Sequence, residues 1–597
     1  MMSHTEQSLS MTTNKRVLSY EKSWQRVMEF ENLPNEILLD CLKYFHALDL
    51  FYSFSQLNQR FDQLIRTLPW YVDFQDVQRS LYDRFCQHML DDLDGQEQID
   101  SLRLSNENTP GQIEDFLSRF SLEQFSRLRS LTLIDLGNNN IQSLKDILPK
   151  LSQLTTLRLL NSGIDEYELQ PCIPINHLQT LAMNSNLAFV ARTIPMKRLT
   201  LSTVSLNEIS RLFQYTPLLQ YLNVACIRME VMNAEYHRSS CPAHLKHLIL
   251  ADFQPDFHEL NCFLQNMANL RNLTVTSSND SSMISAPHWQ QLITSSFPYL
   301  KDFRFKLGYD SWSRISVVSL VFPSFQTDFW LKEHHWYVEC LVQNSFCMIY
   351  TVPYRTAFSQ LPLQSRRISA RLSDDAQIFE HVRKLVVSEN DVRKHGKYYF
   401  SNVTSLVITD SLRITNEDDE RHFIDCLSSL LKLTHLKHLE LSLDCRSERL
   451  FLLLQILQLA PQLSSLCTKR CSFELLAAHY PKSSRCLNDQ IRKLNLREYC
   501  PFGNHQLCRV NLLDQSVPNL EQLTMSMVDS DDLFFLLNHF SKLSSFTVHF
   551  MSKDYPQELE MFKKQALERN AIVDEVIVKF RDEFLATIGV WITRNTG

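Results

Sequence analysis

The sequence predicts an α/β fold in two unequal parts: a small α-helical module near the N-terminus, and a long solenoid that repeats one strand and one helix. Three observations support this prediction. An apolar string with the spacing apolar-x-x-apolar-x-apolar recurs along most of the 597 residues. Segments with the apolar spacing of helices lie between its copies. Two further helical stripes precede the copies, within residues 30–65.

The recurring string has the properties of a short strand that is buried on one face. Side chains alternate along a strand, so the two apolar residues of L-x-L point the same way and the residue between them points out. Each strand is too short to bury its face alone, and stacked copies make one continuous core. Most copies recur at a period of roughly 20–29 residues. The copies lie at 99–104, 128–133, 154–159, 178–183, 196–201, 219–224, 245–250, 270–275, 300–305, 382–387, 403–408, 436–441, 463–468, 491–496, 520–525 and 543–548.

The segments between copies predict helices. Ile113, Phe116 and Phe120 are spaced as one helical stripe, and Ser205 with Glu208 has the pattern of a capping box. Similar spacing appears at 263–267 and at 533–537, the latter after an acidic start that suits a helix N-terminus. An all-α array is the alternative, and the recurrent leucine or β-branched end of the L-x-L string argues against it.

This pattern resembles the leucine-rich-repeat solenoid of ribonuclease inhibitor over most of residues 99–548. The resemblance implies a curved, right-handed horseshoe with strands on the inner face and helices on the outer face. The repeats are degenerate, because the asparagine expected three residues past L-x-L is usually absent.

Residues 30–65 contain the two helical stripes of the N-terminal module. Pro34 suits the first turn of a helix. Helices of this size cannot bury a large core alone, so they need a partner or the following domain. The first stripe consists of Ile37, Leu38, Cys41, Leu42 and Phe45, and the second of Leu50, Phe54, Leu57, Phe61 and Leu64.

This segment resembles the F-box family. The family opens with Leu-Pro-x-Glu-Ile/Leu, matched here from Leu33 to Leu38, and continues with an apolar-loop-Asp-Leu step, matched from Phe45 to Leu50. It ends near a basic residue followed by an aromatic one, matched by Arg60 and Phe61, while Leu57 and Gln59 depart mildly from the usual ending.

The resemblance implies that the module binds a Skp-type adaptor, which joins a cullin scaffold, by inserting apolar side chains at an interface. The alternative is that these helices only cap the N-terminal end of the solenoid. The residues implied in adaptor binding are Leu33, Pro34, Glu36, Ile37, Leu38, Leu42, Leu50, Phe54 and Leu57.

The repeat pattern lapses between Phe305 and Val382. An aromatic-rich stretch at 329–342, a polar step and an apolar stretch at 346–352 predict a β-hairpin. Insertions in repeat arrays often lie on a functional face, so this segment is either a recognition element or, alternatively, a divergent repeat or a brace packed against the horseshoe. After the last copy, 556–570 predicts a charged helix and 584–593 an apolar strand, which together cover the open end of the solenoid.

The expected organisation follows from these boundaries. It consists of a disordered tail at 1–29, the F-box at 30–70, a helical linker at 71–98, leucine-rich repeats at 99–306, an insertion at 307–381, further repeats at 382–548 and a C-terminal cap at 549–597.

Composition removes several function classes. The nine glycines are never closer than Gly589 and Gly597, which excludes the usual phosphate-binding loops and the hydrolase elbow. The pairs His244/His247 and His435/His438 have metal-ligand spacing, but each overlaps a repeat string that explains it without a metal. We therefore expect no catalysis, no metal and no cofactor.

Charge and cysteine usage bear on partners and compartment. The net charge of −7 is small for this length, which argues against a nucleic-acid partner. The 15 cysteines follow no framework, and we find neither a signal peptide nor an apolar run long enough to span a bilayer. We expect no membrane partner and a location in the cytoplasm, the nucleus or both.

The inner face of the horseshoe is expected to hold a target protein by surface contacts. The function expected is that of a non-catalytic substrate-recognition subunit of a cullin-based (SCF-type) ubiquitin ligase, which brings its target close to a ubiquitin-charged enzyme. The alternative is a ligase-independent binding scaffold. The candidate target-binding residues, which mix polar groups of both signs, are Thr132, Arg158, Thr200, Asn223, Thr274, Arg304, Glu440 and Asn495.

Overall fold

A computed structural model describes this chain from residue 30 to residue 593, with gaps. The longest gaps cover residues 230–241, 311–320, 442–449, 498–512 and 551–571, together with most of 470–488. The expected tail at 1–29 and the expected charged helix at 556–570 lie outside the described residues, as does most of the expected helix at 533–537.

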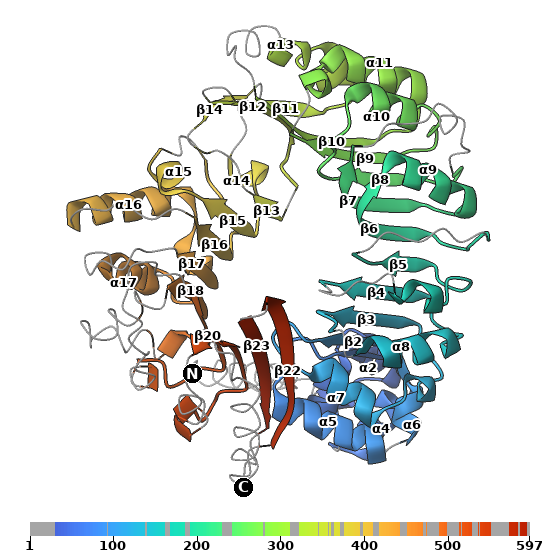
Figure 1. The fold of residues 1–597 in the computed structure, drawn as a ribbon, viewed down its shortest axis with the longest axis vertical. Helices are drawn as coiled ribbons and strands as arrows, with labels where there is room; N and C mark the ends of the chain where they lie inside the picture. Colours follow the sequence, from blue (N-terminus) through green and yellow to red (C-terminus); the bar gives the residue numbers. More distant parts are fainter. Residues whose placement is uncertain are drawn as a thin grey trace, which may run out of the picture.

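Two long sheets follow one another around the molecule, with strands facing its centre (Figure 1). The first sheet has 13 strands, and β1 to β10 pair in parallel in sequence order. These strands are β1 (Trp70–Asp73), β2 (Ile99–Ser105), β3 (Ser130–Ile134), β4 (Thr156–Leu160), β5 (Thr180–Ala182), β6 (Arg198–Ser205), β7 (Tyr221–Arg228), β8 (His247–Leu250), β9 (Asn272–Ser277) and β10 (Asp302–Asp310).

The second sheet has 10 strands and begins with eight that pair in parallel. They are β13 (Phe358–Ser359), β15 (Lys384–Val387), β16 (Ser405–Ile408), β17 (His438–Leu441), β18 (Ser465–Lys469), β19 (Lys493–Arg497), β20 (Gln522–Met527) and β21 (Ser545–Phe550). The last two strands pair antiparallel, in the order β21, β23 (Leu585–Thr593) and β22 (Ile572–Asp582).

The strand register explains why the apolar string recurs. Leu131 pairs with Leu157, and Leu222 with Leu248, so the first leucine of each L-x-L forms a row across the sheet. These leucines are fully buried. The residue between the two apolar positions is exposed or half-buried in most copies, and the exceptions are Ala182, Val407 and Cys467, which are buried. The chain is therefore a mixed α/β protein with long parallel-strand sheets, as expected for a repeat solenoid.

Helices cover the outer side of the sheets (Figure 1). The predicted capping box is confirmed at α9, where Glu208 N–H donates to Ser205 Oγ at 3.3 Å and Ser205 N–H donates to Glu208 Oε2 at 2.7 Å. The outer helices are α7 (Gln112–Arg119), α8 (Ile141–Ile147), α9 (Leu206–Tyr215), α10 (Phe257–Leu264), α11 (Ala286–Ser296), α15 (Glu389–Arg393), α16 (Glu417–Leu430) and α17 (Leu450–Leu459).

Shorter helical turns stand beside or between these elements. They include η1 (Phe30–Asn32), η2 (Leu122–Gln124), η4 (Leu148–Lys150), η6 (Gln170–Cys172), η8 (Ser281–Ile284), α13 (Phe322–Ser324), α14 (Asp375–Ile378) and η11 (Leu433–His435).

The expected helical linker at 71–98 needs a correction. It contains α5 (Arg79–Asp91) and α6 (Leu93–Glu97), but Trp70–Asp73 is strand β1, parallel to β2. Trp70 and Val72 are buried while Tyr71 between them is exposed, which is the alternation of a strand on a one-sided core. The first sheet therefore begins inside the segment assigned to the linker.

An antiparallel hairpin joins the two sheets. Strands β11 (Tyr337–Gln343) and β12 (Phe346–Val352) pair with each other, while β12 also pairs with β10 and β11 with β14 (Arg366–Ser369). Alternate side chains belong to different cores: Cys340 and Ile349 join the core of the first sheet, and Leu341 and Tyr350 join that of the second. The hairpin thus lies between the two cores and packs on both, and it is called the β11–β12 wedge below.

The first strand of this hairpin is shorter than the sequence indicated. The segment Phe329–Glu333 is a π-helix rather than the beginning of a strand. Its Trp330 is fully buried against Phe325, with ring centroids 4.9 Å apart, and the Trp336 ring centroid is 6.1 Å away. This aromatic packing explains the high aromatic content that suggested a longer strand.

The C-terminal strands close the solenoid into a ring (Figure 1). Trp591 of β23 is buried against Tyr82 of α5, with ring centroids 4.8 Å apart. Ser545 Oγ donates to the Asn108 carbonyl oxygen at 3.0 Å, and Lys493 Nζ lies 3.6 Å from Asp76 Oδ1. The last strands therefore pack on the first repeats, rather than only covering an open end.

Candidate protein-binding surfaces

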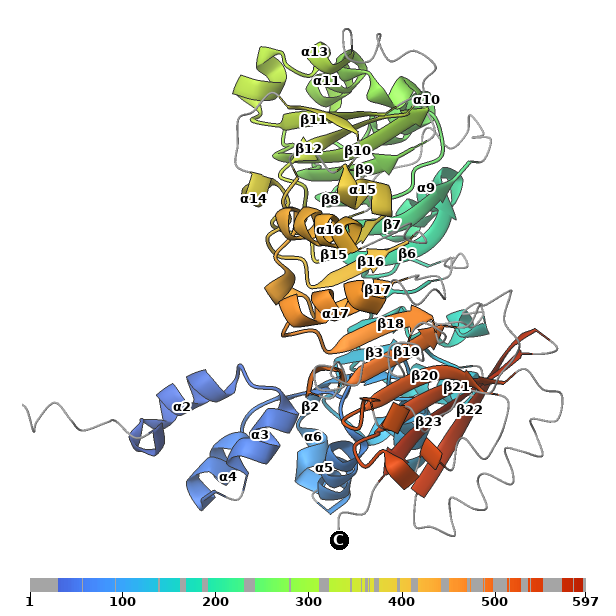
Figure 2. The same ribbon diagram turned by 90° about the vertical axis from the view of Figure 1, so that its left-hand side faces the viewer.

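The N-terminal module is three short helices with a core of their own. The helices are α2 (Asn35–Leu42), α3 (Ala47–Phe54) and α4 (Gln59–Ile65), and they project from one side of the ring (Figure 2). Asn58 caps α4 by accepting a hydrogen bond from Phe61 N–H at 3.0 Å. The separate core consists of Leu38, Leu42, Leu50, Phe61, Leu64 and Leu68.

Three of the residues implied in adaptor binding are not on the surface. Leu38 and Leu42 are 0% exposed and Leu50 is 2% exposed, because all three point between the helices into the module core. They hold the module together and offer no contact area to a partner. The assignment of these three residues to a direct interface is therefore wrong for this conformation.

The other implied residues lie nearer the surface. Pro34, Glu36, Ile37 and Leu57 are exposed, with Ile37 at 47% and Leu57 at 56%. Leu33 and Phe54 are half-buried against the module core. The structure thus separates the implied set into a supporting group and a group that a partner can reach.

Exposed apolar side chains gather on this module. Within the described part of the chain ten large apolar residues are exposed, and five of them lie between residues 30 and 57. Phe30 and Phe45 both contact Phe54, with ring centroids 5.9 and 5.5 Å away, so they form one aromatic patch. The five are Phe30, Ile37, Tyr44, Phe45 and Leu57.

Arg60 holds the beginning of α2 in place. Its Nε donates to Asn35 Oδ1 at 2.8 Å, and its terminal nitrogens donate to the carbonyl oxygens of Glu31 and Leu33. The sequence identified Arg60 only as part of the family ending. Its positioning role was not visible, because its partners lie about 25 residues earlier in the chain.

The candidate target-binding residues occupy equivalent positions on the strands. Thr132 pairs with Arg158, Thr200 with Asn223 and Thr274 with Arg304 in the strand register. The same row continues in the second sheet through Glu440, Cys467 and Asn495. These eight residues are exposed or half-buried, and Arg304 is already paired with Asp302. Their position is that predicted, while their role in binding stays a prediction.

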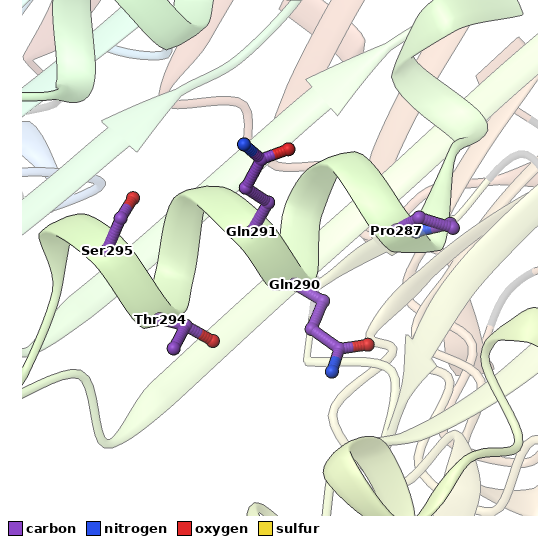
Figure 3. Close-up of a pocket in the computed structure, with 5 residues that line it drawn as sticks. All are labelled: Pro287, Gln290, Gln291, Thr294 and Ser295. Carbon is purple, nitrogen blue, oxygen red and sulfur yellow. The ribbon is translucent and has the colours of Figure 1, made fainter.

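The described residues offer little to catalysis. Among them no three His, Cys, Asp or Glu side chains gather as metal ligands would. A hollow beside α11 is lined by Pro287, Gln290, Gln291, Thr294 and Ser295, whose only polar side-chain groups are amides and hydroxyls (Figure 3). Among all the described residues, every helix is too short or too polar to cross a bilayer.

Comparisons with known proteins do not assign this chain to a family. No family model matches it, and no curated protein does. Among solved structures, the crystal structure of a TLR13–ssRNA13 complex is similar over 72% of this chain, at 12% identity and a TM-score of 0.22. This chain spans 57% of that protein's length.

A second solved structure, M. capricolum TrmK with S-adenosyl-homocysteine, is similar over 38% of this chain and 68% of its own, at 12% identity and a TM-score of 0.12. Likenesses this weak carry no argument about function. The class of protein is defined by the strand pairing itself: a mixed α/β repeat solenoid closed into a ring, with a small helical module that has a separate core.

Proposed function

We propose that this protein is the substrate-recognition subunit of a cullin-based ubiquitin ligase. In this proposal the three-helix module is an F-box that binds a Skp-type adaptor, and the ring is a leucine-rich-repeat receptor for the target protein. The chain supplies proximity rather than bond chemistry. Such a role belongs to the cytoplasm or the nucleus, where thiols stay reduced, and none of the described cysteines is in a disulfide.

One observation carries the proposal. Half of the large apolar side chains exposed in the described part of the chain lie on a module that projects from the ring (Figure 2). Exposed apolar clusters on a folded protein mark binding sites. Ile37 lies within the Leu-Pro-x-Glu-Ile string, so the sequence resemblance and the exposed surface fall on the same helix.

A ligase-independent scaffold is the second candidate, and one observation favours it. Ala47, Leu48 and Ile65 of the module belong to the core of the first sheet rather than to the module core. The module therefore covers the end of the solenoid at β1, as a simple cap does. The two candidates differ in whether the opposite, exposed side of the module binds an adaptor.

The experiment that separates them is a pull-down with Ile37→Asp/Leu57→Asp. Both residues are exposed and contribute little to the module core, so a loss of binding reports the surface and not unfolding. We expect the wild-type chain to recover the adaptor and the cullin, and the variant to lose both by at least about tenfold, because charged side chains at an apolar interface are left desolvated.

The matched control is Met229→Asp/Leu459→Asp, which changes two exposed apolar residues of the ring. It should recover the adaptor as the wild type does. If the wild-type chain recovers no adaptor, or if both variants lose it equally, the ligase proposal fails and the scaffold remains.

A further inference from the structure

Basic side chains gather at one edge of the first sheet. Lys197, Lys246, Arg271 and Lys301 each stand immediately before a strand. Their backbones are neighbours: Arg271 N–H donates to the Lys246 carbonyl at 2.8 Å, and Lys301 N–H donates to the Arg271 carbonyl at 2.8 Å. Arg198, the first residue of β6, adds a fifth cation. The parallel register thus aligns cations that lie far apart in the sequence.

Among the described residues, none of these five cations is ion-paired with a carboxylate. The turns that lead into β6 to β10, residues 192–197, 216–220, 242–246, 267–271 and 297–301, contain neither Asp nor Glu. Asp302 lies just inside β10 and is already paired with Arg304. Partial burial and the cations Arg198, Lys246 and Arg271 together lower the pKa of His247, which is a sign of a local positive field. The positive field is local, because the net charge of the whole chain is −7.

Two exposed apolar side chains lie among these cations. Leu218 is 42% exposed in the turn before β7, and Tyr299 is 60% exposed in the turn before β10. A protein segment can cover apolar groups, whereas a phosphate backbone gains nothing from them. The Arg198 guanidinium lies 4.5 Å from the centroid of the Tyr221 ring, so that face of the ring is not available for base stacking.

We propose that the edge from Lys197 to Lys301, named here the basic edge, docks an acidic segment of a partner protein that also carries apolar side chains. Strands lie about 4.8 Å apart, so β6 to β10 span roughly 19 Å, the length of about six extended residues. Complementary charge accelerates and orients such docking, and the two apolar residues add contact area.

The basic edge lies on the side of the ring where the helical module is attached. Ile65 ends α4 only a few residues before β1, so the module joins the sheet at the N-terminal end of its strands. Parallel strands all begin at the same edge, and Figure 2 shows the module projecting from one side of the ring. The docking of an acidic segment does not depend on the proposed function. Only the further step, that the partner is a target for ubiquitination, rests on it.

The test measures binding of the full chain to a short fluorescein-labelled peptide of glutamate with interspersed leucine, by fluorescence anisotropy. The wild type should bind, and binding should weaken as salt is added, because exposed charges are screened. The charge reversal Arg198→Glu/Lys246→Glu/Arg271→Glu should weaken binding at least about tenfold. The control Lys394→Glu/Arg421→Glu/Lys432→Glu changes the net charge equally at exposed sites on and beside the helices α15 and α16 and should bind as the wild type does.

A second variant keeps the test valid if the charge reversal fails to fold. Leu218→Ser/Tyr299→Ser should weaken binding of the leucine-containing peptide and leave an all-glutamate peptide unaffected. The proposal is overturned if the wild type does not bind the peptide at low salt, if the control loses binding equally, or if single-stranded poly(U) binds more tightly with the same dependence on the variants. If Ile37→Asp/Leu57→Asp loses the adaptor but still binds the peptide, the adaptor site and the basic edge are independent, and each proposal can fail without the other.

Discussion

Four charged side chains form a partly buried ion cluster where the two ends of the solenoid meet. Arg79 donates to Asp83 at 3.0 Å and to Asp115 at 2.8 Å, and Arg119 donates to the same two carboxylates at 2.9 and 3.0 Å. The Arg79 side chain is 2% exposed, and its guanidinium lies 4.5 Å from the ring of Trp591. Two charges of each sign balance here, which makes their burial tolerable.

Replacing Arg79 tests this cluster. Arg79→Met keeps the length of the side chain but leaves Asp83 and Asp115 with one cation between them. We expect the free energy of unfolding to fall by about 3 kcal/mol, because removing one partner leaves a buried charge without full compensation. Urea denaturation followed by circular dichroism measures this change.

The control is Lys150→Met, which removes an exposed ion pair with Glu123. Its unfolding should match that of the wild type, because exposed pairs contribute little. A similar loss in both variants would show that burial of the Arg79 cluster has no special effect.

The buried thiol of Cys86 predicts how the stability of the protein depends on pH. Burial raises the pKa of this thiol from 9.0 to about 12. Between these values the unfolded chain has released the proton while the folded chain still holds it, so stability is complete below pH 9 and falls as the pH rises towards 12. In Cys86→Ala the free energy of unfolding should fall less steeply with pH above pH 9, by about 1.4 kcal/mol per pH unit.

Urea denaturation of both proteins at a series of pH values from neutral to strongly alkaline measures this difference in slope. Parallel slopes in the two proteins would mean that the Cys86 thiol titrates normally in the folded chain.

At the scale of elements, β23 determines how the ring closes. Gly589 lies so close to the first repeats that a Cβ built on it would approach Pro110 Cβ at 2.6 Å. Any side chain at this position must push the strand away from Pro110, because real Cβ contacts are never so short. Glycine is therefore required here for close approach, not for an unusual backbone conformation.

Gly589→Ala should loosen the closure of the ring. We expect a cost of about 1–3 kcal/mol in stability, as for other overpacked contacts, together with a larger radius of gyration in small-angle X-ray scattering. Gly137→Ala is the control, since a Cβ there would lie at an ordinary 3.5 Å from Glu114 Oε1. An unchanged radius of gyration in Gly589→Ala would show that β23 yields without opening the ring.

At the scale of the whole molecule, closure removes the two open ends that a solenoid otherwise exposes. The start of the first sheet is covered by α3 and by Trp591, and the last parallel strand is paired with β23. Terminal repeats must be covered to keep their core from water. Here each end is covered partly by the other, and the β11–β12 wedge joins the two sheets on the opposite side (Figure 1).

Local patterns predicted much of this architecture. The strands at 131–133, 248–250 and 439–441 follow from an apolar period of two, and the capping box at Ser205 follows from neighbours three residues apart. The strand β1 was missed because Trp70–Asp73 lacks the leucine string. The aromatic stretch at 329–336 was misassigned because burial among aromatic rings, rather than strand pairing, selects those residues.

The sequence by itself determined the repeating strands, the helices between them, and the row of outward positions that includes Arg158 and Asn223. These depend on the periods of strands and helices, which act over a few residues. Only the tertiary structure decided that Leu38 and Leu50 are buried while Ile37 and Leu57 are exposed, that cations of separate repeats form the basic edge, and that the ring is closed. Those features depend on contacts such as that between Ser545 and Asn108, and no local period carries information across such a separation.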